Sequence, residues 1–106
     1  MATGLEWTTA TELAQLIRRV KLSPVELVNH LLSRIERVNP TVNAYCTVVA
    51  DEARAAAKLA ETAARSGDEL GLLHGIPYSL KDLTPTRGIR TTMGSKIFEH
   101  NVPDAD

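Results

Sequence analysis

"VNAYCTVVADEARAAAKLAETAARSG", residues 42–67, is the stretch from which the fold is predicted, because its two halves have different patterns. The first half, residues 42–49, is rich in β-branched and aromatic side chains and predicts a strand, although so short an apolar run would also suit a buried helical turn. The second half, residues 51–66, is alanine-rich, with acidic side chains in its first turn and a basic one in its last. This pattern predicts a helix that ends at Gly67.

The next patterned segment is "IPYSLK", residues 76–81. Apolar and polar side chains alternate along it, with Ile76, Tyr78 and Leu80 on one face, and a period of two is typical of a strand. Strand, helix and strand in this order predict a βαβ unit, in which a right-handed crossover joins two parallel strands.

Two amphipathic helices are expected ahead of this unit. Residues 9–20 open with a Thr-x-x-Glu capping box and carry apolar residues three and four positions apart. Residues 23–38 open with Ser23 and with Pro24 at the first helical position, where a missing N–H costs nothing. The "NP" pair at 39–40 is expected to stop this helix. The two helices predict an N-terminal helical hairpin.

The expected fold class is therefore α/β, with an N-terminal helical hairpin and a βαβ unit of a larger mixed sheet covered by helices. A parallel sheet normally has more than two strands and carries helices on both faces. We accordingly expect residues 1–106 to be the N-terminal part of a single domain whose remainder is absent from this chain.

Composition argues against several function classes. The chain has 12 basic and 13 acidic side chains, so no positive field is expected to attract nucleic acid or an anionic membrane. The sequence has no signal-peptide pattern and no apolar run long enough to span a membrane. Cys46 is the sole cysteine, and a lone thiol fits a reducing compartment, so a cytoplasmic location is expected.

The motifs predict neither a metal site nor a phosphate site. His30, His74 and His100 are too far apart in the sequence to show metal-ligand spacing. Gly75 and Lys81 superficially suggest a phosphate loop, but a Walker loop needs its lysine directly after the last glycine, with a helix next. No metal or cofactor is therefore expected.

Lys81 has two open interpretations. On spacing alone, a lysine followed by Asp82 at a strand end is more often a solvated charge. It also stands at the carboxyl end of a predicted strand, where chemistry gathers in parallel sheets, and a lysine kept neutral by burial can accept a proton from a hydroxyl nucleophile. Asp82, one residue on, is expected on the opposite face, so it need not hold Lys81 protonated.

"TTMGS", residues 91–95, is equally open to two interpretations. The first is a turn whose threonines bond to local backbone groups. The second is a cleft wall, where Gly94 permits close approach of a substrate to the backbone. The residues themselves favour the turn.

Three segments together resemble the amidase signature family. They are "SPVELVNHLLSRIERVNPTVNAY" at 23–45, "GLLHGIPYSLKDL" at 71–83 and "TRGIRTTMGSK" at 86–96. Members of that family typically show a Leu-x-Gly-Ile/Val-Pro-x-x-x-Lys-Asp strand and then a Gly-x-x-Thr-Thr-x-Gly/Ala-Ser segment. The resemblance covers nearly the whole chain.

The resemblance implies hydrolysis of a linear amide C–N bond through an acyl-enzyme, by a Ser–cis-Ser–Lys triad and without a cofactor. It implies that Lys81 is the catalytic base and that Thr92, Met93 and Gly94 lie near the substrate cleft. The family's two serines and oxyanion hole belong to a Gly/Ser-rich region with no counterpart in this chain, which alone is expected to be inactive. The expected partners are a small-molecule amide and the rest of the amidase domain, with a homodimer among the open possibilities.

Two rival functions stay open. The same motifs are similar to the A subunit of tRNA-dependent amidotransferases, in which the triad releases ammonia from glutamine. A rival from another class is a non-catalytic interaction module. In that case the hairpin of residues 9–38 docks on a partner through Leu27 and Leu31, and Lys81 is an ordinary surface charge.

Overall fold

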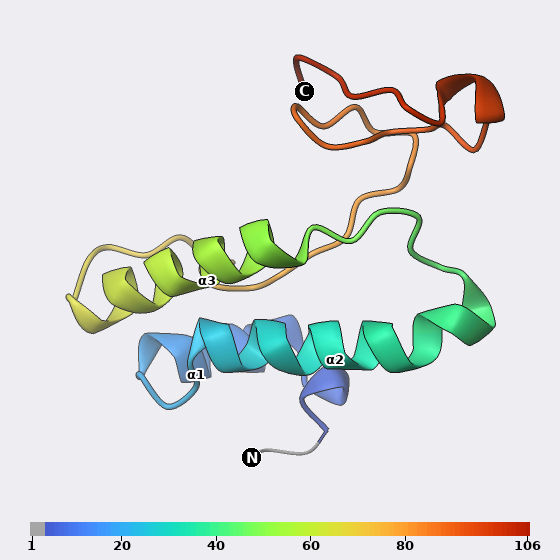
Figure 1. Cartoon of the computed structure of the whole chain (residues 1–106). Coiled ribbons are helices and arrows are strands. Elements are labelled where there is room, and N and C mark those ends of the chain that lie inside the picture. Colours follow the sequence, from blue (N-terminus) through green and yellow to red (C-terminus); the bar gives the residue numbers. More distant parts are fainter. Residues whose placement is uncertain (1–3) are drawn as a thin grey trace. The chain divides into compact units, whose positions relative to one another are not determined.

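A computed structural model describes residues 4–106, which divide into two compact units. The first, called here the helical unit, comprises residues 4–43 and 50–77, and the second, called the loop unit, comprises residues 44–49 and 78–106. The regular elements, in chain order, are the 3-10 helix η1 (Leu5–Trp7), the α-helices α1 (Ala10–Arg18), α2 (Pro24–Val42) and α3 (Ala50–Arg65), and the 3-10 helix η2 (Lys96–Phe98) (Figure 1).

Hydroxyl caps start the first two α-helices. Thr9 Oγ1 accepts a hydrogen bond from the Glu12 N–H at 3.2 Å ahead of α1, and Ser23 Oγ accepts one from the Val25 N–H at 3.0 Å ahead of α2. Each bond satisfies one of the backbone donors that a helix start leaves unpaired. Pro24 then occupies the first position of α2, as its sequence context predicts.

The core of the helical unit forms where the apolar faces of these helices meet. Its buried members are Leu5, Leu13, Ile17, Leu22 and Leu27. α3 packs along α2 (Figure 1), and the small side chain of Ala57, which is buried, lets the two helices approach closely. Ile76 packs against the same cluster, so the segment that follows α3 returns to the core.

The strands expected at 42–49 and 76–81 are wrong. Within residues 4–106 there is no strand, and the only ladder-type pairing is an isolated antiparallel bridge between Thr86 and Ile89. Val42 is the last residue of α2, and residues 44–49 and 76–81 lie outside any regular element. The predicted βαβ unit, and with it the α/β class, is replaced by helices joined to irregular loops.

The physical reason lies in what a strand requires. A high β propensity mostly reports how well a side chain packs against neighbours on adjacent strands. A strand also needs a second backbone that pairs with its N–H and C=O groups. In the part of the chain that the structure describes, neither 44–49 nor 76–81 has such a neighbour, so the alternating pattern does not produce a sheet.

The C-terminal end of α2 also differs from the prediction. The helix continues through Pro40 to Val42, although "NP" was expected to stop it. A proline removes one helical hydrogen bond and crowds the preceding turn, and at this position the loss is confined to the end of the helix. Asn43 ends it with φ 50° and ψ 41°, and its N–H donates to the Asn39 carbonyl oxygen at 2.7 Å.

Candidate functional site

Lys81, the predicted catalytic base, lies in the loop unit at the start of a turn. Its carbonyl oxygen accepts a hydrogen bond from the Thr84 N–H at 2.9 Å. Its side chain is exposed, and no other residue of the loop unit forms a hydrogen bond or an ion pair with its ammonium group. The loop unit by itself therefore does not supply the burial that a lysine base requires.

Asp82, the neighbour of Lys81, turns its carboxylate towards Thr92. Oδ1 accepts a hydrogen bond from the Thr92 N–H at 2.7 Å, and Oδ2 accepts one from the Thr92 hydroxyl. The hydroxyl bond and then the amide bond hold the pKa of the Asp82 carboxyl below its ordinary value of 3.8. The two contacts join the residue after Lys81 to the predicted cleft residues.

The predicted cleft residues Thr92, Met93 and Gly94 form most of a tight turn. The Ser95 N–H donates to the Thr92 carbonyl oxygen at 3.0 Å, and both central residues have positive φ, 55° at Met93 and 70° at Gly94. Positive φ at both positions is the signature of a type I′ turn. Thr92 is buried, whereas Met93 and Gly94 are exposed at the tip, so the turn presents its backbone to solvent.

Thr91 and Arg90 tie this turn to the rest of the loop unit. The Thr91 N–H donates to the Asn101 carbonyl oxygen at 2.9 Å, and the Asn101 side-chain amide donates to the Thr91 carbonyl oxygen at 2.9 Å. The Arg90 guanidinium donates to the Glu99 carbonyl oxygen and to Thr47 Oγ1, the latter at 3.3 Å. Segments distant in sequence are thus held together by single backbone bonds and by side-chain bonds rather than by a sheet.

These organising residues were missed by sequence reasoning. Asp82 was expected only to point away from Lys81, and neither Arg90 nor Asn101 stands in a pattern that marks it. The Thr91 hydroxyl donates to the Ile89 carbonyl oxygen at 3.1 Å, which is the local bonding predicted for a turn threonine. Asp82 and Thr92 are ten residues apart in an irregular loop, so no sequence period pointed to their contact.

The three histidines have separate environments in the structure. His30 Nε2 lies 2.6 Å from Glu6 Oε2, His74 Nε2 lies 2.8 Å from the Ala60 carbonyl oxygen, and His100 is exposed. Among residues 4–106 no group of three His, Cys, Asp or Glu side chains is placed to hold a metal ion. No helix in that range is long and apolar enough to cross a membrane.

The two leucines that the interaction-module hypothesis assigns to a docking surface pack in or against the core of the helical unit. Leu27, at 0% exposed, belongs to the core of the helical unit, and Leu31 packs against that core. Substitutions at Leu27 would therefore act first on folding. Leu27 is therefore not free to bind a partner.

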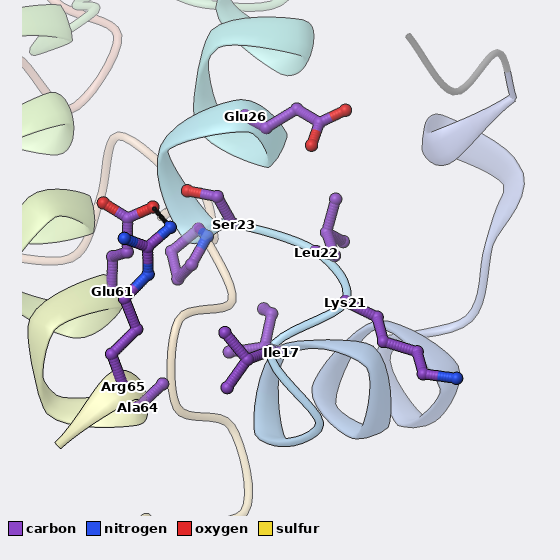
Figure 2. A pocket seen from close by; sticks show the side chains of 10 residues that line it. Ile17, Lys21, Leu22, Ser23, Glu26, Glu61, Ala64 and Arg65 are labelled. Carbon is purple, nitrogen blue, oxygen red and sulfur yellow. Dashed lines mark ion pairs between the residues drawn. The ribbon is translucent and has the colours of Figure 1, made fainter. Parts of the chain in front are cut away.

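A shallow pocket of about 240 Å³ lies in the helical unit, and none of the predicted site residues lines it. Figure 2 shows Ile17 and Leu22 on one side of it and the ion-paired Glu61 and Arg65, with Nη2 and Oε1 3.4 Å apart, on the other. Ser23 also lines the pocket, and its hydroxyl caps the start of α2.

Comparison with known proteins gives a consistent result. A family model described as "Amidase" matches residues 26–106. The chain is 48% identical over 98 residues to the glutamyl-tRNA(Gln) amidotransferase A subunit of Geobacter metallireducens, which covers 92% of this chain and 20% of that protein. It is 37% identical over 100 residues to an acylamidase of Rhodococcus erythropolis, covering 93% of this chain and 21% of that protein.

The chain thus spans about a fifth of the length of the curated relatives that it matches. No solved structure matches it significantly.

Proposed function

The chain belongs to the amidase family, and from this membership we propose that it forms the N-terminal part of an amidase domain that hydrolyses linear carboxamides. The resemblance read from residues 23–96 is confirmed by the family match over residues 26–106. The proposed substrate is a small-molecule amide. We also place the protein in the cytoplasm, because its lone thiol, Cys46, is exposed and fits a reducing compartment.

In this proposal Lys81 is the base of a Ser–cis-Ser–Lys triad whose two serines come from the rest of the domain. The neutral amine accepts the proton of the cis-serine hydroxyl while that hydroxyl takes the proton of the nucleophilic serine, whose oxygen attacks the amide carbonyl. When the C–N bond breaks, the proton returns along the same route to the departing amine, leaving an acyl-enzyme. Water, deprotonated by the same route, then releases the carboxylic acid.

The observation that carries the proposal is that the family match includes both Lys81 and the turn of residues 92–95. The structure supports it, because Asp82 follows Lys81 directly and bonds to Thr92 at 2.7 Å. The proposed base and the proposed cleft wall therefore belong to one compact unit. In the proposed enzyme the rest of the domain buries the Lys81 amine, since burial favours the neutral form of a lysine.

A second candidate is glutamine amide hydrolysis in the role of the A component of a tRNA-dependent amidotransferase. It is favoured by the identities, which reach 37% for the acylamidase and 48% for a protein that bears the name of such a component. The proposed chemistry at Lys81 is the same in both cases. They differ in the amide that is cleaved and in whether partner subunits receive the ammonia.

The test is ammonia release by the full-length protein from a small carboxamide and from glutamine, with and without amidotransferase partner subunits. We expect ammonia from at least one amide, and a covalent acyl adduct on the protein in samples quenched during turnover. Ammonia from glutamine only with the partners present identifies the amidotransferase role, whereas ammonia from the carboxamide without partners identifies the amidase. The 106-residue chain alone is the control and is expected to release none. Absence of both ammonia and adduct would refute the proposal.

A further inference from the structure

Asp82 has no place in the proposed proton transfer, yet both oxygens of its carboxylate accept hydrogen bonds from Thr92. Oδ1 accepts from the Thr92 N–H at 2.7 Å and Oδ2 accepts from the Thr92 hydroxyl. Hydrogen bonds to an ionised carboxylate are roughly twice as strong as neutral ones. Because these bonds also lower the pKa of Asp82, the carboxylate stays ionised at neutral pH and the two contacts persist.

These bonds fix the first residue of a turn whose backbone is strained. Met93 has φ 55°, a left-handed conformation that costs an L-residue free energy, and only the next position is a glycine. Such a conformation persists where the surroundings over-determine it. Thr92, the first residue of the turn, is fixed by Asp82 at its amide and its hydroxyl, and it is buried.

Asp82 does not act as a counter-ion to its neighbour. Within residues 4–106 no ion pair joins it to Lys81, since both of its oxygens face Thr92. The cation that acts on it is Arg90, whose charge contributes to lowering the Asp82 pKa. Lys81 is therefore not held in its charged form by an ion pair with Asp82, and the function of Asp82 must lie in geometry.

We propose that Asp82 is a positioning residue, whose bonds to Thr92 fix the backbone of Lys81 relative to the turn of residues 92–95 and so set where the Lys81 amine stands against the substrate. The Cα atoms of adjacent residues are about 3.8 Å apart, so a fixed carboxylate at Asp82 restricts the starting point of the Lys81 side chain. This inference rests on the proposed role of Lys81 as the base. Asp82 acts through Lys81 and touches no reacting atom.

The loss of Asp82 should affect substrates differently according to their leaving group. A misplaced Lys81 amine returns the proton poorly to a departing amine, which needs it, whereas the alkoxide that leaves an ester needs it less. Loss of Asp82 should therefore lower amide hydrolysis more than hydrolysis of the matching ester. A merely structural role would lower both rates by the same factor, because it would reduce only the amount of folded enzyme.

The experiment measures kcat and KM of the full-length protein for one carboxamide and its matching ester, in the parent and in the variants Asp82→Ala, Asp82→Asn and Lys81→Ala. We expect Asp82→Ala to lower kcat for the amide by about 100-fold, as a displacement of about 1 Å in a reacting group would. The ratio of amide to ester turnover should fall on the order of tenfold. Asp82→Asn keeps the size of the side chain and one acceptor, so its amide-to-ester ratio should lie between those of the parent and Asp82→Ala. It replaces Asp82→Ala in the test if that variant does not fold.

Two further variants locate the effect. Asp104→Ala changes an exposed aspartate of the same loop unit, and it should keep the parent ratio. Thr92→Val removes the hydroxyl and keeps the N–H. Combined with Asp82→Asn it should lower the ratio no further than Asp82→Asn alone, because the two side chains act as one pair.

The outcomes separate the two proposals. If Lys81→Ala lowers the amide rate and the ratio while the Asp82 variants leave the ratio at the parent value, the positioning role is overturned and the function stands. If Lys81→Ala leaves the amide rate intact, the proposed function fails, and the positioning role fails with it. A fall of the ratio in Lys81→Ala and in both Asp82 variants supports both.

Discussion

Gly75 is the one glycine of residues 4–106 at which an added Cβ atom would meet other atoms within 4 Å, so the variant Gly75→Ala tests how the core of the helical unit is packed. Gly75 has φ 79°, a left-handed conformation. A Cβ atom added there would lie 3.0 Å from Pro24 Cγ, 3.1 Å from Ile17 Cδ1 and 3.3 Å from Ile17 Cγ2. Both neighbours are almost completely buried. The proline ring is rigid and the isoleucine is β-branched, so neither can easily move aside.

The magnitude follows from two costs. An L-residue in the left-handed region loses about 1–2 kcal/mol, and overpacking of a well-packed core typically costs about 1–3 kcal/mol. Alanine also lowers the conformational entropy of the unfolded chain, which raises the free energy of unfolding by about 0.4–1 kcal/mol. Gly75→Ala is therefore expected to lower the free energy of unfolding by roughly 2–4 kcal/mol, or Tm by on the order of 10–20 °C.

Two glycines of the same unit serve as matched controls. Gly67 has φ 73° with open space around it, so Gly67→Ala isolates the backbone cost. Gly71 has open space and no positive φ, so Gly71→Ala should be nearly neutral. Thermal and denaturant unfolding followed by circular dichroism should rank the three variants Gly75, Gly67, Gly71 from most to least destabilised. A Gly75→Ala protein no less stable than Gly67→Ala would refute the packing argument.

The remaining predictions concern the core and the acid range. Leu27→Ala, at a site 0% exposed, should lower the free energy of unfolding measured in denaturant by about 2–5 kcal/mol. Leu73→Ala, at a site 68% exposed, should lower it by under about 0.5 kcal/mol. Equal losses in the two variants would contradict the core assignment. Stability should also fall in acid. The Glu6 pKa is lowered from 4.5 by a backbone amide and by His30, and the Asp82 pKa from 3.8 by Thr92. A carboxyl whose pKa is lower in the folded than in the unfolded chain stabilises the fold at any pH above its unfolded-state pKa. This stabilisation is lost as the pH falls through the folded-state pKa. Tm should therefore decline below about pH 4.5, and less so in Glu6→Gln; a constant Tm would contradict this.

How far the sequence predicted the structure depended on the distance over which each interaction acts. Thr9 and Ser23 cap helices through bonds to residues two or three positions away, so their spacing was enough to predict where α1 and α2 begin. The alanine-rich helix likewise formed at Ala50–Arg65, within a residue of its predicted ends. Strands at 42–49 and 76–81 were predicted from local pattern but depend on a distant partner, which is why that part was wrong.

The site shows the same limit. Lys81 was singled out by a family resemblance, and the residues alone favoured a surface charge. The Asp82 contact with Thr92 spans ten residues in an irregular loop, where no period of two or 3.6 marks which side chains meet. A turn was foreseeable from Gly94, but methionine has no preference for positive φ, so the conformation of Met93 had no signal in the sequence.

The most direct test of the account is the turnover of the full-length protein when Lys81 is changed. Lys81→Ala and the control Lys58→Ala, which alters an exposed lysine of α3, would be compared for kcat on the amide that the parent hydrolyses, with circular dichroism to establish that both are folded. Removing a general base typically costs about 10²–10⁴-fold. We predict a loss of that size in Lys81→Ala and parent-like turnover in Lys58→Ala. Parent-like turnover in a folded Lys81→Ala protein would contradict the assignment of Lys81 as the base.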